Sequence, residues 1–82
     1  MIVVGAQALE TYWRGDPAAE GPLRALHALM VRMSASDAER LLAGAERLEH
    51  GSLILRLRGR QVRLRVNADI GLVHIEGVEK TR

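Results

Sequence analysis

The sequence predicts a small α+β domain in which helices cover one face of an antiparallel sheet. Residues 53–66 alternate between apolar and polar side chains, which is typical of strands with one buried face. Residues 6–44 instead repeat apolar side chains every three or four positions, as amphipathic helices do. The expected element order is therefore β-α-α-α-β-β-β, in a single domain that spans residues 1–82.

The chain has 82 residues, no cysteine and a formal net charge of +2. The lack of cysteine excludes a disulfide framework and a cysteine-based zinc site, which suits a cytoplasmic protein. There is no basic leader or apolar run of membrane-spanning length, so we expect a cytoplasmic location and no membrane partner. Residues 1–50 carry five arginines against seven acidic residues, whereas residues 51–82 carry seven basic against three acidic residues. The positive charge is thus concentrated in the predicted sheet, which favours an anionic partner.

The N-terminal half begins with a predicted strand and two helices. Residues 2–4 form a short apolar strand, and residues 6–14 form a helix with one apolar stripe. A second helix begins near Pro17 or Gly21, after a helix-breaking turn, and runs to about residue 33. The residues expected to face the core from these helices are Leu9, Tyr12, Trp13, Leu23, Leu26, Leu29, Met30 and Met33.

A third, short helix follows. Ser36 and Glu39 have the spacing of a capping box, which predicts that Ser36 is the N-cap of this helix. Gly44 is the expected stop, because glycine readily adopts the backbone conformation that ends a helix.

The basic hairpin is the clearest motif of the sheet. Gly59-Arg60 separates its two alternating runs, and glycine in the first position of a two-residue loop suits a type II′ turn. Such a turn would place leucine and valine on one face, in the pairs Leu57–Val62, Leu55–Leu64 and Leu53–Val66. The other face would carry the pairs Arg58–Gln61, Arg56–Arg63 and Ile54–Arg65.

In this register Arg56 and Arg63 would lie opposite each other on the open face. Like charges across a ladder repel, so a bound phosphate would favour the arrangement more than stability does. A solvated face on which arginine has no partner is the alternative. A further strand over residues 72–76 would place His74 opposite Arg65 and Glu76 opposite Arg63.

Two blocks of the sequence resemble one family of toxins. They are Leu9-x-x-Tyr12-Trp13-x-x-x-Pro17-x-Ala19-Glu20-x-Pro22-Leu23-Arg24-Ala25 and Leu55-Arg56-Leu57-Arg58-Gly59-x-x-x-Arg63-Leu64. These blocks resemble the Leu-x-x-Phe-Trp and His-Pro-Asp-Ala-Glu-x-Pro-Leu opening, and the Gly-Asn-Lys-Tyr-Arg-Leu hairpin, of HigB-type toxins in the RelE-like superfamily. Asp16 stands where that family has histidine.

The resemblance implies a RelE-like fold, with helices packed on one side of a small antiparallel sheet. It also implies the toxin of a type II toxin–antitoxin system: an mRNA interferase, or metal-independent endoribonuclease, that cuts messenger RNA, usually on the ribosome, and is neutralised by a cognate antitoxin. The family's terminal Gly-Thr-His motif is represented here by Glu79-Lys80-Thr81, without the histidine. The alternative is therefore a catalytically inactive RelE-like domain that binds RNA or an antitoxin-like protein. A homodimer paired at the hairpin edge stays open.

The candidate site residues follow from the needs of RNA cleavage, in which developing phosphate charge is stabilised and protons are moved. Arginine suits the first role through bidentate phosphate contacts, and His74 is the candidate acid or base. Glu76 is either an alternative base or a salt-bridge partner of Arg63. No metal-ligand spacing or cofactor motif occurs, so we expect neither group. The expected catalytic residues are Arg63, Arg56 and His74, and the expected RNA-binding residues are Arg58, Arg60, Arg65 and Lys80.

Overall fold

The computed structural model describes residues 1–81, except for the side chains of Ala35 and Leu42. Within this range the protein has an α+β fold, as the sequence predicts, with three α-helices, a short 3-10 helix and a five-stranded sheet. The elements along the chain are β1 (Ile2–Val4), α1 (Gln7–Gly15), the 3-10 helix η1 (Pro17–Ala19), α2 (Glu20–Arg32), α3 (Ala35–Gly44), β2 (Glu46–Arg47), β3 (Leu53–Leu57), β4 (Arg60–Asn67) and β5 (Leu72–Lys80).

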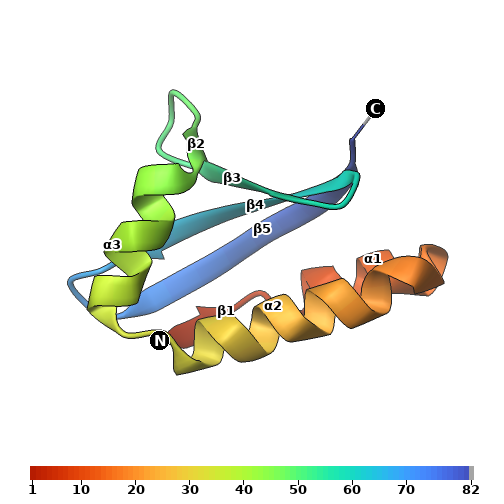
Figure 1. Ribbon diagram of the computed structural model, residues 1–82, viewed down its shortest axis with the longest axis horizontal. Helices are drawn as coiled ribbons and strands as arrows, with labels where there is room; N and C mark the ends of the chain where they lie inside the picture. The colour runs from red at the N-terminus through yellow and green to blue at the C-terminus, as the bar shows by residue number, and fades with distance from the viewer. Residues whose placement is uncertain (82) are drawn as a thin grey trace.

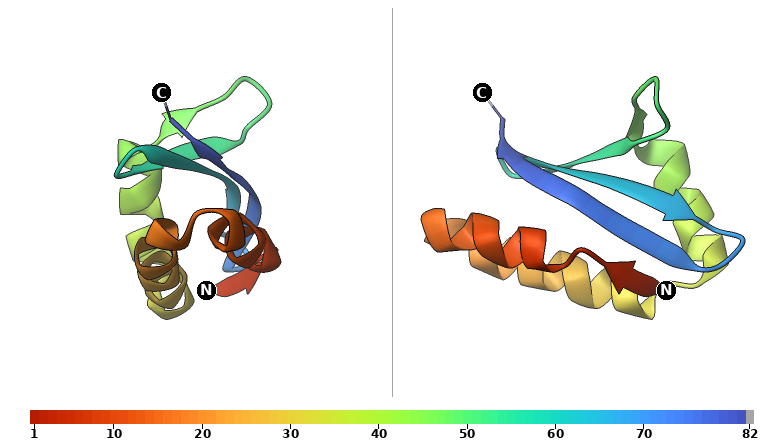
Figure 2. Two further views of the ribbon diagram at one scale, coloured as in Figure 1. Left: turned by 90° about the vertical axis from the view of Figure 1, so that its right-hand side faces the viewer. Right: turned by 180° about the vertical axis from the view of Figure 1, so that it is seen from behind.

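The sheet forms one layer, and α1 and α2 form a second layer beneath it (Figure 1). The strand order is β1-β5-β4-β3-β2; β1 runs parallel to β5, and all other neighbours are antiparallel. Seen from its end, the helical layer is a pair of adjacent helices, and α3 stands beside the β2 edge of the sheet (Figure 2). None of the helices described here is long and apolar enough to cross a membrane.

The hydrophobic core lies between the sheet and the helical layer. The apolar stripes of α1 and α2 point into it as predicted, and Tyr12 and Trp13 are half-buried at its margin. Leu29 was expected in the core but is 56% exposed, because it faces a groove at the side of α2. The buried core residues are Leu9, Ala19, Leu23, Leu26, Met30, Met33, Ala38, Leu53, Val62, Leu64, Val73 and Ile75.

The start of α3 differs from the prediction. Ser34, and not Ser36, is the N-cap: its Oγ accepts a hydrogen bond from the backbone N–H of Asp37 at 3.2 Å, and the Asp37 carboxylate accepts one from the backbone N–H of Ser34 at 3.2 Å. These two bonds form a reciprocal capping box. The backbone N–H of Ser34, together with its hydroxyl, which donates to the same carboxylate at 3.0 Å, holds the pKa of Asp37 below its ordinary value. Ser34 has this role because its backbone is still extended, whereas Ser36 already lies in the first helical turn.

The hairpin loop is Arg58-Gly59 rather than the predicted Gly59-Arg60. Both loop residues have positive φ, 41° and 81°, which is the conformation of a type I′ turn. The twist of this turn matches the twist of the flanking strands, and it frees Arg60 to begin β4. The observed pairs are Leu57–Arg60, Arg56–Gln61, Leu55–Val62, Ile54–Arg63 and Leu53–Leu64.

The predicted register is therefore wrong by two residues, and Arg56 does not lie opposite Arg63. Side chains alternate with a period of two along a strand, so a shift of two leaves each strand residue on its predicted face. Val62 and Leu64 are fully buried as expected, whereas Leu55 and Leu57 are only half-buried beside the free part of the sheet edge.

A β-bulge interrupts the pairing of β4 with β5. Arg65 pairs with His74 and Val66 with Val73, as predicted, but Arg63 pairs with Gly77. The extra residue of β5 is Glu76, which has no Cα partner in β4. Glu76 is thereby displaced from the predicted position opposite Arg63.

Candidate RNA-binding face

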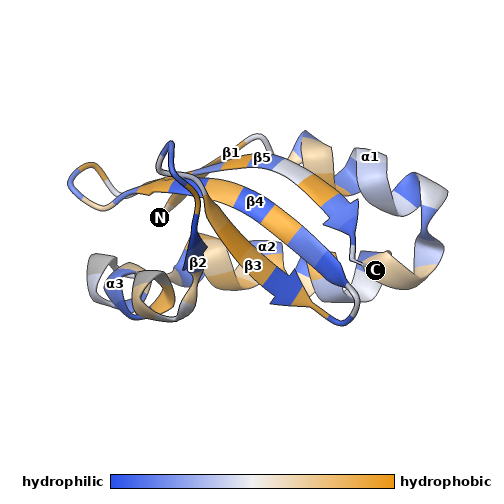
Figure 3. Ribbon diagram, turned by 90° about the horizontal axis from the view of Figure 1, so that it is seen from above, coloured by the Kyte–Doolittle hydropathy of each residue, from blue (hydrophilic) through white to orange (hydrophobic). Residues whose placement is uncertain are grey.

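The face of the sheet that turns away from α1 and α2 is here called the open face (Figure 3). The observed register groups its side chains into rows that cross β3, β4 and β5. Its residues are Ser52, Ile54, Arg56, Gln61, Arg63, Arg65, His74, Glu76 and Glu79. Of the predicted site residues, the structure brings Arg56, Arg63, Arg65 and His74 together on this face.

Each arginine of the open face has a carboxylate beside it. Arg56 pairs with Glu46 of β2 at 2.8 Å, Arg63 with Glu79 at 3.3 Å, and Arg65 lies 3.6 Å from Glu76. The arginine side chains are 40–66% exposed. Ion pairs between groups this exposed are weak, because water screens the charges and each side chain loses freedom in pairing. A phosphate can therefore replace these carboxylates.

A hollow of about 600 Å³ lies at the end of the open face nearest the β4–β5 turn. Arg65 and His74, which are paired across β4 and β5, both line it. The His74 ring lies against the backbone of Gly5, since a Cβ on Gly5 would come within 3.2 Å of the ring. The hollow is lined by Gly51, Arg65, Val66, Asn67, Ala68, Asp69, Leu72 and His74.

The Glu76 carboxylate is hydrogen-bonded to Ser52. The Ser52 side chain is fully buried, and its Oγ donates a hydrogen bond of 2.5 Å to the Glu76 carboxylate. This bond, together with the charges of Arg65 and Arg63, keeps the pKa of Glu76 below its ordinary value. Lowering the pKa of a carboxylate makes it a weaker base. The expected salt bridge between Glu76 and Arg63 is wrong, because Arg63 pairs with Glu79 and Glu76 lies 3.6 Å from Arg65.

Three residues predicted to bind RNA lie away from the open face. The Arg60 side chain is only 15% exposed and points toward the helices. Its guanidinium donates two hydrogen bonds to the Asp16 carboxylate, at 2.8 and 3.0 Å. Lys80 lines a hollow beside Asp16, and Arg58 lies in the loop beside α2. Arg58 was expected on the open face opposite Gln61, but the observed turn places it in the loop.

Asp16 is the residue whose role the sequence did not reveal. It directly precedes η1, but its side chain makes no capping bond. Its carboxylate instead accepts hydrogen bonds from Arg60 and from the Tyr12 hydroxyl, at 2.9 Å. The Arg60 contact is the main reason that the pKa of Asp16 is below its ordinary value, while burial and Asp16 together raise the pKa of Tyr12. This cluster fastens the end of α1 to the start of β4.

Over residues 1–81, no group of three or more histidine and acidic side chains is arranged to hold a metal ion. No protein-family model, curated protein or solved structure matches the chain significantly. The site has to be interpreted from its own chemistry.

Proposed function

We propose that the protein binds single-stranded RNA through the open face and is the toxin of a type II toxin–antitoxin pair that cleaves messenger RNA. The observation that carries the proposal is the grouping of three exposed arginines and His74 on one uncovered sheet face. Guanidinium groups bind phosphate oxygens in bidentate fashion, and the spacing of neighbouring strands lets several phosphates be held together.

The chemistry of cleavage assigns different work to these residues. Attack of a 2′-hydroxyl on the adjacent phosphate requires that the hydroxyl loses a proton, that the leaving 5′-oxygen gains one, and that the phosphate charge is stabilised. Arg63 and Arg65 would stabilise that charge, and Arg56 would hold the neighbouring phosphate. His74, beside Arg65 in the hollow, carries an imidazole that can both donate and accept a proton, so it would move a proton.

A second function, RNA or protein binding without cleavage, is favoured by the state of Glu76. Because Ser52 and Arg65 hold Glu76 in its ionised form, it is a poor proton donor and a poor base. That leaves His74 to serve both proton transfers alone. The two functions differ in a measurable way, since only the first requires His74.

RNA binding can be measured with a fluorescent oligonucleotide that carries 2′-O-methyl groups and so resists cleavage through the 2′-hydroxyl. Affinity is expected to fall with rising salt, and Arg63→Ala should reduce the slope of log affinity against log salt by about 0.7. Arg56→Ala should act similarly. Arg14→Ala is the matched control, because Arg14 also pairs with a glutamate at 2.8 Å but lies on α1. Equal losses from the Arg14 and Arg56 variants would contradict binding at the open face.

Cleavage and toxicity are tested by inducing the protein alone in bacteria. The proposal expects growth arrest with fragmented messenger RNA, and rescue by the product of the adjacent reading frame. Arg63→Ala should remove the effect, because loss of one contact to developing charge costs about two orders of magnitude in rate. If inducing His74→Ala also fails to arrest growth or fragment messenger RNA, the proposal that His74 moves the proton is supported. A harmless wild-type chain that still binds RNA would favour the second function.

A further inference from the structure

The open face continues past its arginines onto an aliphatic row. Ile2 of β1 and Asn67 of β4 are both paired with Leu72 of β5, so these three residues lie side by side across the sheet. Val3 packs against the core, and its neighbour Ile2 therefore points to the open face, where it is 63% exposed. Leu72 is half-buried and lines the hollow at the β4–β5 turn. This row gives the hollow an apolar floor.

A second row carries the charged groups of the hollow. Arg65 and Val4 are both paired with His74, again side by side across the sheet. Along each strand two residues separate this row from the aliphatic row, which corresponds to about 7 Å. A phosphate held by Arg65 and a base resting on Leu72 would belong to one nucleotide at this separation.

The β4–β5 turn places hydrogen-bonding groups at the rim of the hollow. Asn67 and Asp69 both line it, and the Asn67 Oδ1 accepts a hydrogen bond of 3.2 Å from the backbone N–H of Asp69. This bond occupies the oxygen of the Asn67 amide and leaves its NH2 group as a donor. The Asp69 carboxylate is exposed and has no ion pair within residues 1–81. The rim thus offers one donor next to the two acceptor oxygens of a carboxylate.

We propose that the hollow binds a guanine base, which rests on Leu72 while Arg65 holds the phosphate of the same nucleotide. The Watson–Crick edge of guanine presents the acceptor O6 followed by two donors, N1–H and the N2 amino group. Asn67 would donate to O6, and the Asp69 carboxylate would accept from both donors. Adenine, cytosine and uracil do not present two adjacent donors on this edge. The proposal deepens the RNA-binding function and rests on it, because Arg65 must hold a phosphate.

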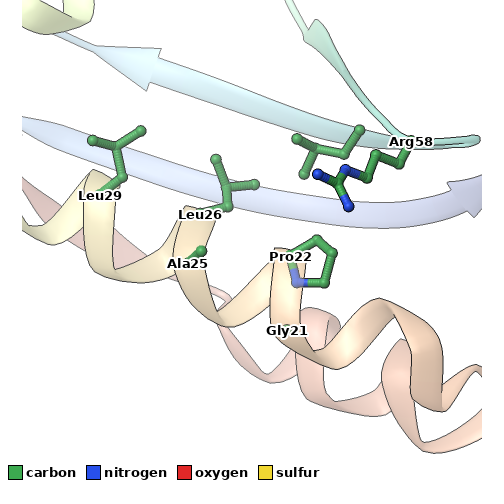
Figure 4. A pocket seen from close by; sticks show the side chains of 7 residues that line it. Gly21, Pro22, Ala25, Leu26, Leu29 and Arg58 are labelled. Carbon is green, nitrogen blue, oxygen red and sulfur yellow. The ribbon is translucent and has the colours of Figure 1, made fainter.

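A groove of similar size between α2 and the end of β3 lacks this chemistry (Figure 4). Its volume is about 500 Å³, and of the residues that line it only Arg58 has a polar side chain. A guanidinium cannot accept a hydrogen bond, so this groove offers no side-chain acceptor for the donors of a base. The hollow at the β4–β5 turn combines an apolar floor, a cation and acceptors.

Short fluorescent oligonucleotides with 2′-O-methyl groups test the proposal, because they bind without being cleaved. One contains only uridine, and in the other a guanosine replaces the central uridine. The guanosine oligonucleotide is expected to bind at least about fivefold more tightly. Inosine, which lacks the N2 amino group, should lose most of this preference. 7-Deazaguanosine should retain it, since its Watson–Crick edge is unchanged.

Variants of the rim identify the recognising groups by the ratio of the guanosine and uridine affinities. Asp69→Ala should bring the ratio close to one. Asn67→Asp should also reduce it, because this change keeps an oxygen for the turn but replaces the donor NH2 group with an acceptor. Glu49→Ala is the matched control: Glu49 is an exposed acidic residue that does not line the hollow, so losing its charge should leave the ratio unchanged. Circular dichroism would verify that all three variants remain folded.

The outcomes separate this proposal from RNA binding itself. Equal affinity for both oligonucleotides, with the salt dependence and the Arg63→Ala effect still present, would overturn guanine recognition and leave RNA binding intact. A preference for guanosine that persists in Asp69→Ala would overturn the assignment to this hollow. Failure of every oligonucleotide to bind would refute the RNA-binding function, and guanine recognition with it.

Discussion

Replacing Arg58 with asparagine is expected to stabilise the protein by about 1 kcal/mol. Arg58 has φ 41°, a left-handed backbone conformation that costs a residue with a long side chain about 1–2 kcal/mol. Asparagine tolerates this conformation better, and Asn-Gly is a preferred pair for a type I′ turn. The Arg58 side chain makes no hydrogen bond or ion pair within residues 1–81 that the change would remove, because Arg60 contacts only its backbone oxygen.

The gain can be measured by urea denaturation and by thermal melting followed with circular dichroism. For a domain of this size, about 1 kcal/mol corresponds to a rise in Tm of roughly 4–8 °C. Urea should shift the midpoint without changing the slope, since the variant buries the same surface.

A second variant tests the same hairpin register with a stability change of opposite sign. Arg60→Asn should destabilise the protein, because it removes the two bonds to Asp16. If the loop were Gly59-Arg60 instead, both signs would reverse: Arg58→Asn would place a poor strand former in β3, and Arg60→Asn would complete a favourable turn. Loss of stability in Arg58→Asn together with a gain in Arg60→Asn would therefore refute the observed register.

Three further outcomes are expected. Ser34→Ala should lower the free energy of unfolding by about 1 kcal/mol, whereas Ser36→Ala should leave it almost unchanged in the same urea titration. Folding lowers the pKa of Asp16, so ionised Asp16 stabilises the folded protein at a pH above the ordinary aspartate pKa, and this stabilisation is lost as the pH falls from about 4 through the lowered pKa. In a plot of Tm against pH, Asp16→Asn should therefore show a smaller fall of Tm on the acid side. Tyr12 and Trp13 both lie on α1, so poly(A), poly(U) and poly(C) should bind the open face with similar affinity in a competition assay, because that face has no phenol or indole ring to stack on bases.

Alternation in the sequence was sufficient to predict the two faces of the sheet. Leu64 is buried and Arg63 faces outward as expected, since a period of two separates the faces whatever the exact register is. The helices could be predicted equally well, because their apolar side chains recur with the helical period. The register itself was not predictable in this way. It depends on whether Arg58 takes a positive φ beside Gly59, and the contact of Arg60 with Asp16 helps to decide that.

The candidate site could be predicted only in part for the same reason. His74 and Arg65 were placed side by side because both lie within a regular ladder. The predicted position of Glu76 was wrong because a β-bulge inserts one residue into β5, and the local sequence pattern does not predict that bulge. The carboxylates that balance the arginines come from separate strands. Their pairing with arginine depends on the three-dimensional arrangement and not on spacing along the chain.

The parallel pairing of β1 with β5 affects how the protein can be made. Ile2 lies next to Leu72, so β1 has no neighbouring strand until β5 has also left the ribosome. β5 is also the strand on which α1 packs, so the early helices lack their support until then. Contacts between residues so distant in the chain slow folding, because a long loop must close before they form. The sheet, and with it the open face, is therefore completed only after β5 has emerged, and a nascent chain that lacks β5 has no assembled arginine face.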